Sequence, residues 1–170
     1  MRWSPTFIPP DQGEGRFDLP FTMGSVLYLA ETPDHAVAEW IQGYRGQLLE
    51  PADLVIETKQ LALVGFTLTE AKRARVVDLC EPGTLVELDL APDRIASRQR
   101  HVTQGIAATI HAAGWWGLRW WSAFFGEWHT VVLFSDRLDT AIEHSEPEPL
   151  AVEHPAVVDA ARALGIVMER

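Results

Sequence analysis

Arg16 is the first residue whose type and setting suit the binding of a phosphorylated ligand. It follows Gly13 and Gly15, two glycines that let the backbone approach a ligand closely. A guanidinium can bind two phosphate oxygens at once and stays charged at any working pH. The alternative is an ordinary solvated loop arginine. The Gly13-Glu14-Gly15 triplet is not a dinucleotide-binding motif, because no predicted strand precedes it and no helix follows it immediately.

Glu39 is a candidate for stabilising positive charge in a transition state. On the helix predicted around it, a turn of about 100° per residue puts Glu39 nearly opposite an apolar stripe, beside the small residues Ala36 and Gly43. A carboxylate on such a cleared face can stabilise an oxocarbenium-like transition state or hold a ribose hydroxyl. A simply exposed helix glutamate is the alternative. The predicted apolar stripe consists of Val37, Trp40, Ile41 and Tyr44.

Tyr28 and Ser122 are two further candidates, each on a predicted strand. The ring of Tyr28 can stack on a nicotinamide or adenine, although a strand tyrosine is more often part of the core. Ser122 has no Gly-x-Ser-x-Gly sequence around it, so a nucleophilic role is not expected. A hydrogen bond from Ser122 to a substrate amide is the functional alternative to a capped strand end.

The densest group of aromatic residues lies between Trp115 and Trp128. Core packing explains most of such a group, and an exposed remainder would indicate an interface. No spacing of histidines, cysteines or carboxylates resembles a metal site, so no metal is expected. Cys80 is the only cysteine, which excludes an intramolecular disulfide and is typical of a reducing compartment.

Composition narrows the class of protein and its partners. The 170 residues predict a single domain, with 47% apolar and 22% charged residues. The net charge of −10 argues against nucleic acid as a partner, because that binding depends on clustered Lys and Arg. No apolar run is long enough to span a bilayer, and no targeting segment is visible. We therefore expect a cytoplasmic protein that does not act at a membrane.

The order of turn formers and apolar runs predicts a mixed α+β fold with a mostly antiparallel sheet. A proline- and glycine-rich loop is predicted over 9–25, and an acidic, mobile linker over 143–155. Predicted strands cover 26–30, 61–68, 75–79, 84–88, 117–122 and 130–135, with a turn over 81–83. Predicted helices cover 33–44, 102–113 and the segment from 155 onward.

Four short motifs in this order resemble the RES-domain family, which is named for an arginine, a glutamate and a serine. The motifs are Gly15-Arg16-Phe17, Tyr28-Leu29-Ala30, Ala36-Val37-Ala38-Glu39 and Gly117-Leu118-Arg119-Trp120-Trp121-Ser122. The resemblance extends over about residues 2–134. It implies an ADP-ribosyltransferase-like fold, α+β (α/β mixed), with a split, largely antiparallel sheet and flanking helices. It also implies a RES-like NAD+-binding domain over 1–138, with 139–170 as a linker and a C-terminal helix packed on it.

Many members of this family are toxins of bacterial toxin–antitoxin modules. They degrade NAD+ by cleaving the nicotinamide–ribose bond, with water or phosphate as acceptor. The resemblance implies Glu39, Arg16 and Tyr28 as catalytic residues, and Arg16, Tyr28, Ser122 and Arg2 as NAD+-binding residues. NAD+ is then the substrate, with no further cofactor. An antitoxin protein is the implied partner, and a homo-oligomer is a second candidate assembly.

The chain also departs from the family pattern. Asp18 follows the Arg-Phe step where a neutral polar residue is expected, and a carboxylate beside a bound pyrophosphate is unfavourable unless it points away. Trp120 and Trp121 are bulkier than expected before Ser122. Two alternatives therefore stay open: an ADP-ribosyltransferase that modifies a macromolecule, and a non-catalytic interaction module.

Overall fold

The computed structural model describes residue 8 and residues 12–122, 125–138 and 142–169. The chain forms two compact units: residues 1–29 with 67–143, and residues 30–66 with 144–170. Helices and strands occur in both units, which confirms the predicted α+β class. The predicted domain boundary near residue 138 stays a prediction.

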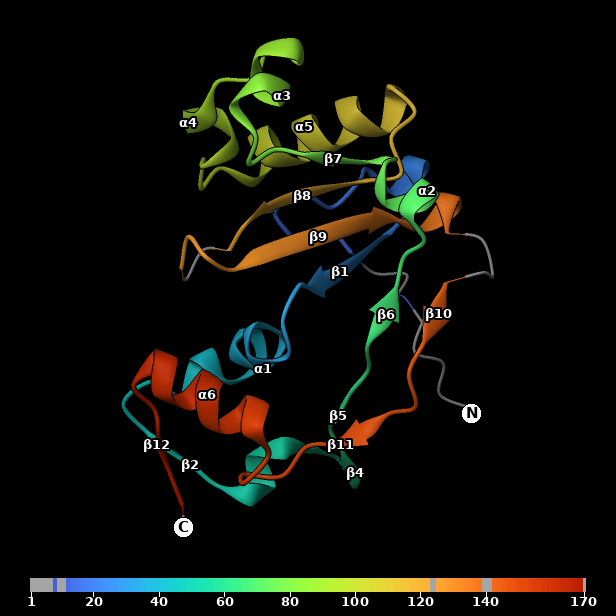
Figure 1. Cartoon of the computed structure of the whole chain (residues 1–170). Helices are drawn as coiled ribbons and strands as arrows, with labels where there is room; N and C mark the ends of the chain where they lie inside the picture. Colours follow the sequence, from blue (N-terminus) through green and yellow to red (C-terminus); the bar gives the residue numbers. More distant parts are fainter. Residues whose placement is uncertain (1–7, 9–11, 123–124, 139–141, 170) are drawn as a thin grey trace. The chain divides into compact units, whose positions relative to one another are not determined.

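The first unit is built on a four-stranded sheet in the order β1-β9-β8-β7. β7 and β8 run parallel, with Val77 opposite Leu118, and β8 and β9 run antiparallel, with Leu118 opposite Val132. β1 lies next to β9 in the sheet, and the two strands run in opposite directions (Figure 1). The four strands are β1 Val26–Ala30, β7 Val76–Asp78, β8 Gly117–Trp121 and β9 His129–Phe134, so these four predicted strands are confirmed.

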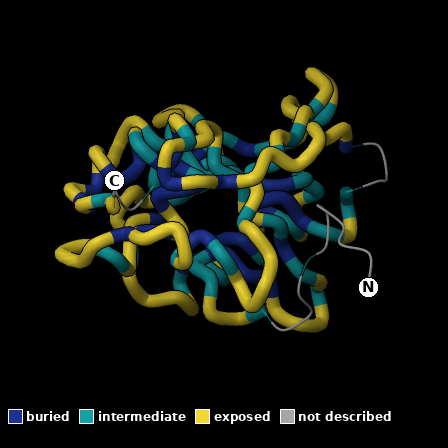
Figure 2. Tube along the Cα trace, turned by 90° about the horizontal axis from the view of Figure 1, so that it is seen from below, coloured by how far each residue is buried: buried dark blue, intermediate teal, exposed yellow. Residues whose placement is uncertain are grey.

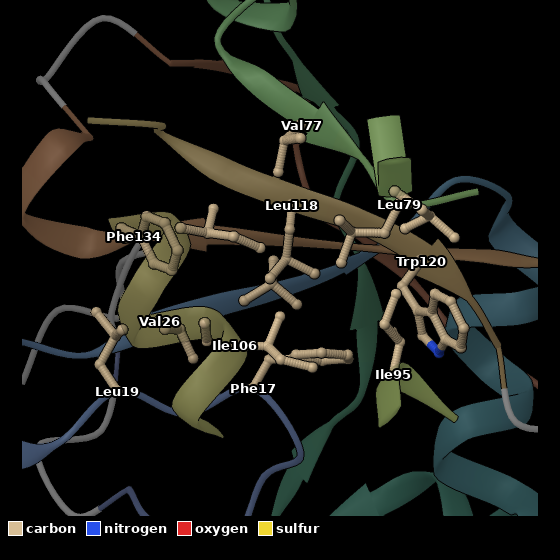
Figure 3. Close-up of a cluster of buried hydrophobic side chains, with 14 residues drawn as sticks. Phe17, Leu19, Val26, Val77, Leu79, Ile95, Ile106, Leu118, Trp120 and Phe134 are labelled. Atoms are coloured by element: carbon tan, nitrogen blue, oxygen red, sulfur yellow. The ribbon is translucent and has the colours of Figure 1, made fainter. Parts of the chain in front are cut away.

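Helix α5 (Arg100–Ala112) packs against this sheet and confirms the predicted second helix. Ile106 and Ile110 lie four residues apart and both are buried, as a one-sided apolar helix requires. Gly114 ends the helix region with a φ of 92°, a conformation that favours glycine. Figure 3 shows how the core side chains from the sheet, from α5 and from the N-terminal loop meet. The labelled ones are Phe17, Leu19, Val26, Val77, Leu79, Ile95, Ile106, Leu118, Trp120 and Phe134.

The predicted strand over 84–88 is wrong, because this segment forms helix α3 (Pro82–Glu87). Pro82 occupies the first helical turn, where its missing N–H costs nothing, so it begins a helix instead of forming a turn. Leu85 is buried and Leu88 packs against the same core, whereas Val86 is 81% exposed, so the buried side chains do not alternate as they would on a strand. The short helical elements of this unit are α2 Glu70–Arg73, α4 Pro92–Ile95, and the 3₁₀ helices η1 Phe21–Met23 and η4 Ser135–Arg137.

The second unit centres on two packed helices, α1 (Pro33–Ile41) and α6 (Pro155–Leu164). Both are predicted from the sequence, although α1 tightens into the 3₁₀ helix η2 (Gln42–Tyr44) over its predicted last turn. α6 ends at Gly165, whose φ of 68° lies in the left-handed region. Around the helices lie η3 Pro51–Leu54, the parallel pair β2 Leu48–Leu49 and β12 Val167–Met168, and the hairpin β3 Val55–Ile56 and β4 Lys59–Gln60.

The predicted buried strand over 61–68 is also wrong, since no residue of this run is fully buried. Figure 2 shows the trace of the chain coloured by burial. Gly65 separates it into β5 (Ala62–Leu63) and β6 (Phe66–Thr67). Their partners are β11 (Glu148–Pro149) and β10 (Glu143–His144), both from the segment predicted to be a mobile linker. The acidic segment is therefore held by strand pairing, which its composition does not reveal.

Candidate functional site

The loop that carries Arg16 is organised by the buried carboxylate of Asp18. One carboxylate oxygen of Asp18 accepts hydrogen bonds from the backbone N–H groups of Gly13 and Gly15, at 2.7 and 2.8 Å. The other accepts a hydrogen bond from the hydroxyl of Tyr28 at 2.8 Å. Asp18 is only 3% exposed, so its charge is directed into the loop instead of toward a ligand. This geometry removes the electrostatic objection that the sequence raised.

Gly15 is required by the same arrangement. A Cβ atom at this position would lie 2.3 Å from a carboxylate oxygen of Asp18 and 2.5 Å from the hydroxyl oxygen of Tyr28. Both distances are far below van der Waals contact, so any side chain would force the loop away from its anchor. The glycine next to Arg16 therefore serves the packing of the loop on Asp18 and Tyr28.

Helix α5 holds the loop from the other side. The side-chain amide of Gln104 donates to the carbonyl oxygens of Gly13 and Gly15, both at 2.9 Å. The hydroxyl of Thr103, a fully buried residue, donates to the carbonyl of Arg16. These bonds fix the backbone on both sides of Arg16 although the segment contains no regular secondary structure.

The Arg16 side chain is half-buried and bonded on one side only. Its Nη2 donates to the carbonyl oxygens of Ile95 and Ser97, at 2.7 and 3.3 Å, and its guanidinium lies 5.7 Å from the ring centre of Phe17. Within the described residues no carboxylate pairs with Arg16, and its buried Nε has no hydrogen-bond partner there. Burial lowers the pKa of the Arg16 guanidinium below its ordinary value, and the Tyr28 hydroxyl acts in the opposite direction. The side chain stays a cation without a counter-charge from the described part of the chain.

Tyr28 uses its hydroxyl as a bridge within the protein. The hydroxyl accepts a hydrogen bond from the backbone N–H of Phe17 at 2.9 Å while it donates to Asp18. Burial raises the pKa of the Tyr28 hydroxyl well above its ordinary 10.0, and the hydrogen bond to Asp18 adds to the increase. The residue as a whole is 38% exposed. The hydroxyl is therefore committed to the loop, and stacking by the ring stays a prediction.

Ser122 directly follows β8, as predicted, and is half-buried. Its backbone N–H donates to the carbonyl of Trp128 at 2.7 Å, which continues the pairing of β8 with β9. Trp120 is 6% exposed and contacts the edge of the Trp121 ring at a centroid distance of 4.5 Å. Most of the tryptophan bulk before Ser122 therefore packs within the unit, as the core explanation predicts. Arg2 lies outside the described residues.

Glu39 lies on α1 in the second unit, where its side chain is 46% exposed. The helix begins with a side-chain cap: the Thr32 side chain accepts from the N–H of His35, and Pro33 is the first helical residue. The predicted apolar stripe is only partly correct. Trp40 is 49% exposed, because α6 packs on a face that excludes it. The buried face of α1 consists of His35, Val37, Ala38 and Ile41.

His35, on the buried face of α1, precedes Glu39 by one helical turn, and the two side chains are in contact. The His35 Nε2 lies 3.2 Å from a carboxylate oxygen of Glu39, and the Gln42 amide lies 3.5 Å from the other oxygen. Thr103, Gln104 and His35 were not predicted from the sequence, and Asp18 was predicted only as an unfavourable charge, not as the anchor of the loop. Only the spacing of four between His35 and Glu39 could have indicated such a contact.

A model of the RES domain family matches residues 2–155 of the chain. The chain belongs to the RES domain family. No curated protein and no solved structure matches it significantly. The match extends beyond the predicted resemblance into the strands that pair with 61–68, and it includes every residue of the predicted RES site. These residues are Arg2, Arg16, Tyr28, Glu39 and Ser122.

The structure brings together two of the predicted RES residues, Arg16 and Tyr28, through the loop held by Asp18. Ser122 belongs to the same unit, and Glu39 to the other. The described residues contain no group of three or more His, Cys, Asp or Glu that could hold a metal ion. In the same part of the RES chain, no helix is long and apolar enough to cross a membrane.

Proposed function

We propose that this RES domain protein degrades NAD+ by cleaving the bond between nicotinamide and ribose. The observation that carries the proposal is the setting of Arg16. Its backbone is fixed by Asp18, Thr103 and Gln104, and its cation has no carboxylate partner within the described residues. A fixed, half-buried cation of this kind suits a phosphate group, which a guanidinium can bind through two oxygens.

Each predicted residue then has a separate task. Arg16 holds the phosphates, with Arg2 as a helper, and the ring of Tyr28 stacks at the nicotinamide ribose end. Ser122 fixes the carboxamide by a hydrogen bond. The carboxylate of Glu39 stabilises the ribose cation that develops as the C–N bond breaks. The bonding electron pair leaves with neutral nicotinamide. An oxygen of water, which releases a proton to solvent, or an oxygen of phosphate then bonds to the ribose carbon.

We further propose that this activity makes the protein a toxin, since loss of NAD+ stops cellular redox metabolism. An antitoxin protein would block the site, and the net charge of −10 favours a basic segment in such a partner. A homo-oligomer is a separate proposal about assembly. None of these partners is needed for the bond cleavage itself.

The test is incubation of the full-length protein with NAD+ labelled separately in the nicotinamide and adenylate parts. Release of free nicotinamide with ADP-ribose indicates water as acceptor, and release with a phosphorylated ADP-ribose indicates phosphate. We expect the same rate in the presence of EDTA. Label retained on a macromolecule would instead identify an ADP-ribosyltransferase. A folded protein that leaves NAD+ intact at high concentration would refute the proposal and favour an interaction module.

A further inference from the structure

We propose that His35 is a positioning residue for Glu39, and that it fixes the carboxylate for the cleavage step. This inference rests on the proposed function. His35 is 0% exposed, whereas the side chain of Glu39 is 46% exposed. The pair therefore joins a buried, immobile ring to a carboxylate that stands at the surface of α1.

The direction of the hydrogen bond follows from the chemistry of the two groups. An ionised carboxylate can only accept, so the proton between them belongs to the imidazole Nε2. His35 thus donates to one oxygen of Glu39. The contact of the second oxygen with Gln42 is long, at 3.5 Å, and lies at the exposed surface. That second oxygen is the one available to a ligand.

The ring of His35 is held by the helix packing that buries it. It shares the buried face of α1 with Val37, Ala38 and Ile41, against which α6 packs. Burying an imidazole costs free energy that an apolar residue would not, so packing alone does not account for a histidine here. A surface glutamate, by contrast, samples many rotamers, and fixing one of them costs side-chain entropy. His35 supplies that restraint before a substrate binds.

The decisive experiment compares two variants of His35 in the nicotinamide-release assay. His35→Gln keeps an N–H donor near the position of Nε2, and His35→Leu keeps much of the volume but has no donor. We expect His35→Leu to lower kcat roughly tenfold or more with KM within about twofold, because the lost preorganisation acts at the transition state. We expect His35→Gln to recover at least about a third of the wild-type kcat.

His111→Leu is the matched control, because His111 also contacts a partly exposed carboxylate, Asp136, at 3.0 Å. It should leave kcat unchanged. In the background of Glu39→Gln, His35→Leu should cause little further loss of kcat, whereas a merely structural role would lower kcat in both backgrounds. If His35→Leu does not fold, His35→Asn replaces it, since the shorter amide does not reach Glu39.

The outcomes separate this inference from the proposed function. If the wild-type protein releases no nicotinamide, the proposed function fails and the inference fails with it. If the wild type is active and folded His35→Leu matches its kcat, only the inference is overturned. The inference would also be overturned if kcat fell equally in His35→Gln and in His35→Leu, or in His35→Asn where that variant replaces His35→Leu.

Discussion

Tyr28→Phe separates the two roles that Tyr28 can have. The change removes only the hydroxyl, which bridges Asp18 at 2.8 Å and the backbone N–H of Phe17 at 2.9 Å. The ring, which is the part proposed to stack on NAD+, stays in place. We therefore expect a large loss of stability in the first unit and a smaller effect on the chemical step.

The magnitude follows from the two lost hydrogen bonds. A bond to a charged group contributes about 1.5–3 kcal/mol, and a bond to a neutral backbone group about 0.5–1.5 kcal/mol. Phe17 and Asp18 are 2% and 3% exposed, so water cannot easily replace the hydroxyl. We expect the free energy of unfolding to fall by about 2–4 kcal/mol. With an m-value of about 2 kcal/mol/M, the urea midpoint falls by about 1–2 M.

Urea unfolding followed by tryptophan fluorescence measures this change, since Trp120 is buried in the same unit. Tyr44→Phe is the matched control, because Tyr44 is the only other tyrosine and its hydroxyl, beside the Asp53 carboxylate, lies on a partly exposed surface. Its midpoint should hardly move. A Tyr28→Phe protein within about 0.5 kcal/mol of wild type would refute the bridging role of the hydroxyl.

Three further predictions follow from the same loop. Because the pKa of Tyr28 is raised from 10.0, the folded state keeps its proton while unfolded chains lose theirs above pH 10. The difference in unfolding free energy between wild type and Tyr28→Phe should thus shrink above pH 10, by less than about 1.4 kcal/mol per pH unit because solvent screens the group. Urea titrations that give the same difference at every pH would contradict this. Gly15→Ala should lower the thermal midpoint and raise the KM for NAD+, because its Cβ would collide with Asp18, whereas Gly83→Ala, with open space around it, should change neither. Arg16→Ala should raise KM about tenfold or more with a smaller change in kcat and cost about 1–2 kcal/mol through the lost bond to Ile95; an unchanged KM would exclude Arg16 from NAD+ binding.

The sequence predicted correctly those helices whose first or last turn carries a characteristic residue, such as a capping threonine, a proline or a glycine. Thr32 and Pro33 begin α1, and Gly114 follows α5, because a cap, a fixed φ and a left-handed glycine act within one turn. The strand prediction for 84–88 was wrong for a related reason. Pro82 can begin a helix or form a turn, and only the core that receives Leu85 decides between them.

The candidate site was predictable in its residue types but not in its supports. Nothing in the sequence near Asp18 tells whether its carboxylate faces a ligand or the N–H groups of Gly13 and Gly15. The hydrogen bonds between α5 and the loop join residues far apart in the chain. Gln104, which donates two of them, is polar, so the apolar pattern that predicts α5 does not indicate its role. Long-range hydrogen bonds of this kind leave no periodic signal.

The most direct test of the account is the kcat for nicotinamide release by Glu39→Gln. This variant keeps the shape of the side chain and an oxygen that can accept from His35, so the fold should change by less than about 1 kcal/mol. We expect kcat to fall roughly 10²-fold or more while NAD+ binding stays nearly intact. Glu87→Gln, at an exposed glutamate of α3, is the control and should turn over NAD+ like wild type. A folded Glu39→Gln protein that releases nicotinamide at the wild-type rate would contradict the account.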